Sequence, residues 1–125
     1  MPADVRSRSA AAHRKQVEFE IGDIAEFLQE TLGQKLVAYM ANVQDPKTVG
    51  QWVRKAHMPR SDAEERLRIA FQVFHLLQSE ESAHTVRAWF IGMNPQLDDE
   101  APADAIRAGR LKDVWVAAKA YVAGG

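Results

Sequence analysis

Hydrophobic residues recur with the period of an α-helix through most of the chain after residue 22. Residues that interrupt helices separate these periodic segments, among them Gly33, the turn at 42–44 and the Met58-Pro59 step. The pattern predicts helices over residues 23–33, 34–41, 46–55, 61–79, 82–91, 102–108 and 110–122. Because strand patterns are almost absent, we expect an all-α fold.

Several of these helices have recognisable starts. Asp23 and Ser61 each stand three residues before a glutamate, which is the sequence of a capping box. Pro46 follows Asp45 and takes a first helical position, where its missing N–H costs nothing. Ahead of the first helix, residues 17–21 alternate between hydrophobic and polar types, and this alternation predicts a short extended segment.

The helix expected over 61–79 has the most hydrophobic stripe in the chain, so we expect it to form the core. The stripe consists of Leu67, Ala70, Phe71, Phe74 and Leu77. Residues 1–16 are small, polar and basic without any period, and this composition predicts a disordered arm. The expected division is therefore 1–16, 17–60, 61–81 and 82–125.

The length and composition limit the number of domains and the cellular compartment that we expect. A chain of 125 residues is long enough for one domain or two small modules, and it has no cysteine for disulfides or thiolate chemistry. Its hydrophobic runs are too short to span a bilayer, and its first fifteen residues lack the apolar region of a secretory signal. We therefore expect a cytoplasmic protein with no membrane contact.

The net charge is only −1, but residues 46–60 contain basic side chains and no acidic one. Such a window indicates a local contact with an anion. In the predicted helix there, Val49, Trp52 and Val53 share one side. The opposite side has Lys47, Thr48, Gln51 and either Arg54 or Lys55, with Arg60 just past the helix.

These side chains are the types that read bases in a major groove or hold phosphates, and three short helices form the outline of a helix-turn-helix. The alternative is a small bundle whose outer face is charged because it is solvated, with Trp52 in the core in either case. Two features weaken the DNA interpretation. The turn between the second and third helices is longer than usual, and Gly50 weakens the third helix by about 1 kcal/mol relative to alanine.

Enzymatic chemistry is not indicated. The four histidines, at positions 13, 57, 75 and 84, show no metal-ligand spacing, and no phosphate-binding loop or nucleophile elbow is present. The acidic run Asp98-Asp99-Glu100 is interpreted as a solvated turn. We predict no catalytic residue, no metal and no cofactor.

The last third contains an ordered pattern in the segment WFIGMNPQLDDEAPADAIRAGRLKDVWVAA. Its members are Trp89, Asn94, Pro95, Leu97, Pro102, Ile106, Gly109 and Val114. This pattern resembles the toxin-binding domain of Xre/MbcA/ParS-type antitoxins. In that family an Xre-like helix-turn-helix comes first, with a tryptophan in its third helix as at Trp52. The resemblance covers about residues 23–122 and implies an Xre-like helix-turn-helix bundle followed by a small helical toxin-binding domain.

The resemblance implies an antitoxin of a type II toxin–antitoxin system. Members bind their own promoter, commonly as homodimers, and occlude a RES-domain toxin that consumes NAD⁺ or uses it to modify other proteins. The implied toxin-binding residues are Asn94, Pro95, Leu97, Leu111, Trp115, Tyr121 and Val122. The chain departs from the pattern in its basic arm, its longer second turn and its Gly-Gly ending.

Two alternatives stay open. The chain could be a stand-alone transcriptional regulator, of phage or prophage origin, that uses the same helix without any toxin. It could also be a scaffold whose helix-turn-helix binds only protein. Trp115 itself fits either the core or an interface.

Overall fold

A computed structural model of the protein describes residues 20–124. Within this range the chain consists of α-helices, one 3-10 helix and turns, and it contains no strand. The predicted all-α fold is therefore confirmed. The basic arm predicted over 1–16 lies outside the described residues.

The first described helix covers residues 20–32. The others are α2 (Gln34–Met40), α3 (Lys47–Val53), α4 (Ser61–Gln78), α5 (Ala83–Ile91), the 3-10 helix η1 (Pro95–Leu97), α6 (Pro102–Arg107) and α7 (Leu111–Val122). The predicted helices all exist, although some of their limits differ.

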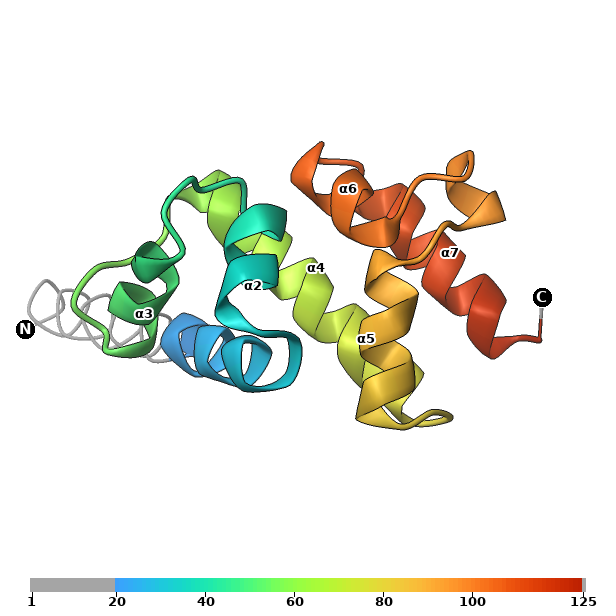
Figure 1. Ribbon diagram of the computed structural model, residues 1–125, viewed down its shortest axis with the longest axis horizontal. Helices are drawn as coiled ribbons and strands as arrows, with labels where there is room; N and C mark the ends of the chain where they lie inside the picture. The colour runs from blue at the N-terminus through green and yellow to red at the C-terminus, as the bar shows by residue number, and fades with distance from the viewer. Residues whose placement is uncertain (1–19, 125) are drawn as a thin grey trace, which may run out of the picture.

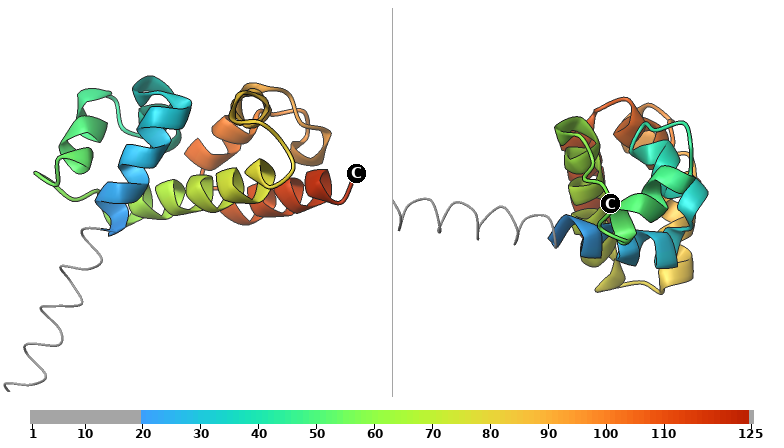
Figure 2. Two further views of the ribbon diagram at one scale, coloured as in Figure 1. Left: turned by 90° about the horizontal axis from the view of Figure 1, so that it is seen from below. Right: turned by 90° about the vertical axis from the view of Figure 1, so that its left-hand side faces the viewer.

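The long helix α4 runs through the middle of the molecule. The helices before it lie at one end, and α5, α6 and α7 lie at the other (Figure 1). Helix α7 packs along α4 in the same direction (Figure 2). At one end of this pair the Arg66 Nε donates to the carbonyl oxygens of Ile106 and Arg107, at 3.1 and 3.2 Å. At the other end the Tyr121 hydroxyl bonds to Glu81.

The core is continuous through both ends of the molecule. Four of the five stripe residues predicted on α4 are fully buried, and Phe71 is half-buried against Phe27. Helix α4 contacts α2 as well as α5, α6 and α7, and α2 also contacts α6. The helices before and after α4 therefore share one hydrophobic core.

The prediction for the first helix was wrong at its start. Residues 20 and 21 are already helical, and Ile21 is buried, so the described part of the expected extended segment is helix. Asp23 consequently lies inside the helix and does not cap it. Ile21, Ile24 and Leu28 continue one helical stripe, and burial of this stripe outweighs the local alternation.

Two further predictions at helix ends were wrong. The expected capping box at Ser61 does not form, because Ser61 is the first residue of α4 and Arg60 is its N-cap without a side-chain bond. Glu64 instead accepts a 2.9 Å bond from Arg68. Helix α3 ends at Val53, two residues early, because Lys55 has a left-handed backbone with φ of 62°.

Other local predictions are confirmed. Pro102 opens α6, and α5 begins at Ala83, one residue after the expected start, because Ser82 is its N-cap and accepts from the Thr85 N–H. Gly109 has φ of 84° and ends α6, while the Arg110 N–H bonds to the Ala105 carbonyl at 2.8 Å. This turn directs the chain straight into α7.

Candidate functional site

Helix α3 buries one side and exposes the other. Val49, Gly50 and Trp52 are buried, and Trp52 is only 3% exposed, so it belongs to the core. Lys47 and Arg54 are exposed and Gln51 is half-buried on the outer side, at spacings of four and seven residues. The structure therefore gathers these three predicted DNA-contact residues on one face.

Two of the remaining predicted contacts border the same region. Thr48, Gln51 and Arg60 line a surface hollow of about 350 Å³ together with His57 and Met58. Arg60 is exposed at the N-cap of α4, across this hollow from α3. The hollow thus extends the polar face of α3 toward α4.

Lys55 points elsewhere. Its Nζ lies 3.1 Å from the Asp23 carboxylate on the first helix, and its stem packs near Gly22. Of the two alternatives, Arg54 and Lys55, it is therefore Arg54 that lies on the outer face of α3. The ion pair joins residues far apart in sequence, so the helical spacing could not reveal it.

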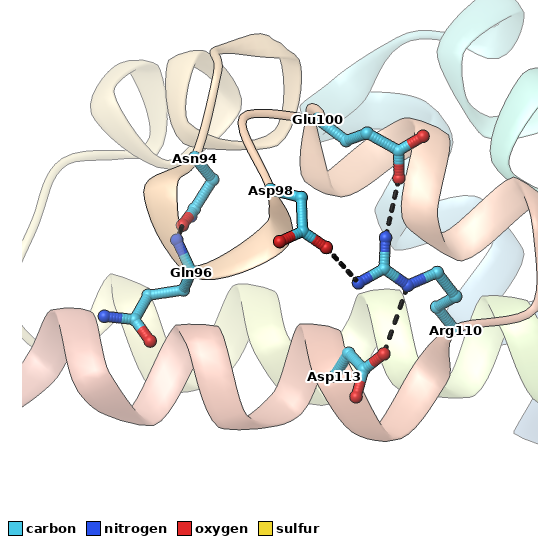
Figure 3. A network of polar contacts seen from close by, with 6 residues as sticks. All are labelled: Asn94, Gln96, Asp98, Glu100, Arg110 and Asp113. Carbon is cyan, nitrogen blue, oxygen red and sulfur yellow. Dashed lines mark hydrogen bonds and ion pairs between the residues drawn. The ribbon is translucent and has the colours of Figure 1, made fainter.

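The segment from Asn94 to Glu100 is a closed turn (Figure 3). The Asn94 side-chain oxygen accepts from the Gln96 N–H at 2.9 Å and caps η1. The Asn94 N–H donates to the Glu100 carbonyl, and the Asn94 carbonyl accepts from Asp99. Asn94 is 8% exposed and Leu97 is fully buried. Both predicted toxin-binding residues hold the turn from inside, so a partner could not reach Leu97 in this conformation.

Arg110 ties the acidic run to α7, which sequence reasoning missed. Its guanidinium reaches Glu100 at 2.8 Å, Asp113 at 3.1 Å and Asp98 at 3.7 Å (Figure 3). The hydrogen bond that Arg110 donates to Asp113 is the main cause that raises the pKa of Arg110. The acidic turn is exposed as predicted, but two of its three carboxylates are paired rather than simply solvated.

A second hollow lies beside this turn. It has a volume of about 250 Å³, and Asn94, Pro95 and Tyr121 line it together with Trp89, Met93, Gln96 and Ala117. Met93 is 82% exposed. The Trp89 Nε1 is buried and has no hydrogen-bond partner among residues 20–124. Tyr121 donates to Glu81, and this bond raises the pKa of Tyr121.

The other predicted toxin-binding residues form a separate group. Leu111, Trp115 and Val122 are half-buried and share one side of α7, at spacings of four and seven residues. Lys119 lies over the Trp115 ring, 5.9 Å from its centroid. Apart from Leu97, which is buried, the predicted set therefore divides between the hollow at Trp89 and this stripe.

The described residues offer little other chemistry. No group of three or more His, Asp or Glu side chains in this part of the chain could hold a metal ion. None of the helices between residues 20 and 124 is both long and apolar enough to cross a membrane. His75 stacks on Phe27 with 4.9 Å between ring centroids.

Comparisons with protein families, curated proteins and solved structures found no match for the chain.

Proposed function

We propose that the chain is a DNA-binding antitoxin that neutralises a RES-domain toxin and represses its own promoter. In this proposal the first helix, α2 and α3 act as a helix-turn-helix, and α3 enters the major groove. The turn at 94–100 and α7 form the toxin-binding part.

The observation that carries the proposal is the outer face of α3. Lys47, Gln51 and Arg54 stand together on it, while Trp52 and Val49 anchor the helix from behind. Such side chains bond to guanine and adenine edges or to phosphates. A helix held by its own core residues presents them on a backbone that is already ordered before binding.

The C-terminal half supports the proposed toxin binding. Arg110 and the Asn94 bonds fix the turn, and the hollow beside it has an exposed methionine and a tyrosine on its border. A hollow bordered by Met93, Pro95 and Ala117 suits a partner segment that brings an apolar side chain. A rigid surface of this kind loses little entropy when it binds.

DNA binding is tested with a duplex from the region upstream of the protein's own coding sequence. We expect a sequence-specific complex that weakens steeply with salt and loses specificity in Gln51→Ala. Equal binding to a random duplex by the wild-type protein would contradict this half of the proposal. Lys47→Ala should weaken binding to both duplexes, and Lys112→Ala on α7 is its matched control, because it also removes one exposed cation.

Toxin binding is tested by co-expression with the RES-domain protein encoded beside it. We expect a stable complex on size-exclusion chromatography that Met93→Glu disrupts, since Met93 borders the hollow and is exposed. Specific DNA binding without any such complex would support a stand-alone regulator instead. Toxin binding without DNA binding would support the protein-only scaffold.

A further inference from the structure

A third hollow joins the two halves of the molecule next to the start of α3. It has a volume of about 430 Å³. Lys35 and Tyr39 line it from α2, Gln44 and Pro46 from the turn before α3, and Arg107 from the end of α6. Pro46 is the N-cap of α3 and directly precedes Lys47, so this hollow lies next to the first residue of the face described above.

Arg107 is fixed in this hollow by its neighbour. Its guanidinium donates to the Tyr39 carbonyl at 2.9 Å and lies over the Tyr39 ring, 4.5 Å from the centroid. The Tyr39 hydroxyl is in turn bound to the Asp104 carboxylate, and this bond raises the pKa of Tyr39. The tyrosine therefore stays neutral near pH 7, and the arginine is oriented before any ligand arrives.

Charge and exposure indicate what the hollow would bind. Arg107 has five N–H donors, and the Tyr39 carbonyl uses only part of this fork. Lys35 is exposed one helical turn from Tyr39, and Lys47 is exposed just beyond Pro46. Two carboxylates lie beside these three cations, that of Asp104 on the Tyr39 hydroxyl and that of Asp45, which accepts from the Lys47 backbone N–H at 3.0 Å. A planar guanidinium next to lysines matches the geometry of a phosphate.

We propose that Arg107 and Lys35 bind a phosphate of the DNA backbone that flanks the site read by α3. The C-terminal half would then be part of the DNA-binding surface, and Arg107 would set the register of α3 in the groove. This inference rests on the proposed DNA binding.

The test measures affinity for two duplexes over a range of salt concentrations. One duplex comes from the protein's own upstream region, and the other has a random sequence. Arg107→Ala and Lys35→Ala should weaken binding to both duplexes by the same factor, because phosphate contacts are independent of sequence. Each should also lower the slope of log K against log salt by about 0.9. Gln51→Ala should instead weaken mainly the upstream duplex.

Lys112→Ala on α7 provides the charge control and should leave both affinities and the slope near those of the wild type. Thermal unfolding shows whether Arg107→Ala remains folded; if it does not, Lys35→Ala decides the question, since its side chain is exposed. Wild-type affinity and slope in these variants would overturn the phosphate contact and leave the proposed function intact. No binding of either duplex by the wild-type protein would overturn both.

Discussion

Arg110 and Asn94 close the turn of the C-terminal half from opposite directions. Asn94 works from inside through backbone bonds, and Arg110 works from outside by holding Asp98 and Glu100 against α7. Asp98 and Asp99 have left-handed backbones, which are unfavourable for residues other than glycine. The bonds of Asn94 and Arg110 hold the chain in this conformation, so the rigidity of the turn depends on two side chains.

Asn94→Ala should lower the free energy of unfolding by about 1 kcal/mol, because it removes the acceptor of the Gln96 N–H. Asn94→Ser keeps a side-chain oxygen that can accept from the same N–H and should recover most of this loss. Urea unfolding of the three proteins measures the effect. Equal stability of wild type and Asn94→Ala would show that the cap is unimportant.

The raised pKa of Tyr39 gives a prediction at alkaline pH. The hydrogen bond to Asp104 requires the phenolic proton, so its contribution to stability is complete below the unfolded-state pKa of about 10. That contribution is lost as pH rises through the higher pKa of the folded state. Absorbance titration should show both tyrosines, Tyr39 and Tyr121, ionising above their ordinary range.

Asp104→Ala should return one of the two transitions toward the ordinary value. Asp113→Ala, which removes a carboxylate facing Arg110 instead, should change neither transition. A tyrosine titration that is identical in wild type and Asp104→Ala would contradict this account of Tyr39.

At the scale of elements, the sequence predicted helix ends well where a proline or glycine fixes the backbone within a single turn. Pro102 and Gly109 lie where the sequence placed them. The capping residues predicted at Asp23 and Ser61 failed for a common reason, since the helix already includes both positions. Burial of Ile21 extends the first helix, and local signals alone cannot show which residues will be buried.

The candidate sites, too, were predictable only where their residues lie on one helix. Helical spacing predicted the outer face of α3, because Lys47, Gln51 and Arg54 are neighbours along one helix. It could not predict that Lys55 pairs with Asp23 or that Arg107 stacks on Tyr39, because these contacts depend on how distant segments pack. Sequence reasoning therefore found the faces of single helices and missed the hollows between them.

Gly50 tests how far its low helix propensity limits the stability of α3, since the packing leaves room for a methyl group there. A Cβ at position 50 would lie 3.2 Å from the end of Arg54 and 3.4 Å from that of Gln34, and both side chains can move. Gly50→Ala should therefore stabilise the protein by up to about 1 kcal/mol. Gly33→Ala is the contrasting variant and should destabilise, because Gly33 has φ of 92°. Thermal unfolding that ranks these variants in the opposite order would contradict the packing of α3 described above.

At the scale of the whole molecule, α4 couples the two proposed surfaces through one core. Phe74 is fully buried in it and contacts Phe27 of the first helix at 5.1 Å between ring centroids. Tertiary support for both α3 and the C-terminal turn therefore depends on the same central helix.

We expect a single cooperative unfolding transition, with circular dichroism and tryptophan fluorescence giving the same midpoint. Phe74→Ala should lower the free energy of unfolding by about 3–5 kcal/mol and keep the transition single. Separate midpoints for Trp52 and Trp89, measured in variants that retain one tryptophan each, would show instead that the two ends unfold independently.

The central claim is that one molecule carries separate DNA-binding and toxin-binding surfaces. The most direct test measures cellular NAD⁺ while the neighbouring RES-domain toxin is co-expressed with three forms of the protein. Wild type and the Lys47→Ala/Gln51→Ala/Arg54→Ala variant should both preserve NAD⁺, whereas Met93→Glu should allow its loss. Depletion of NAD⁺ in the presence of the wild-type protein would contradict the antitoxin proposal.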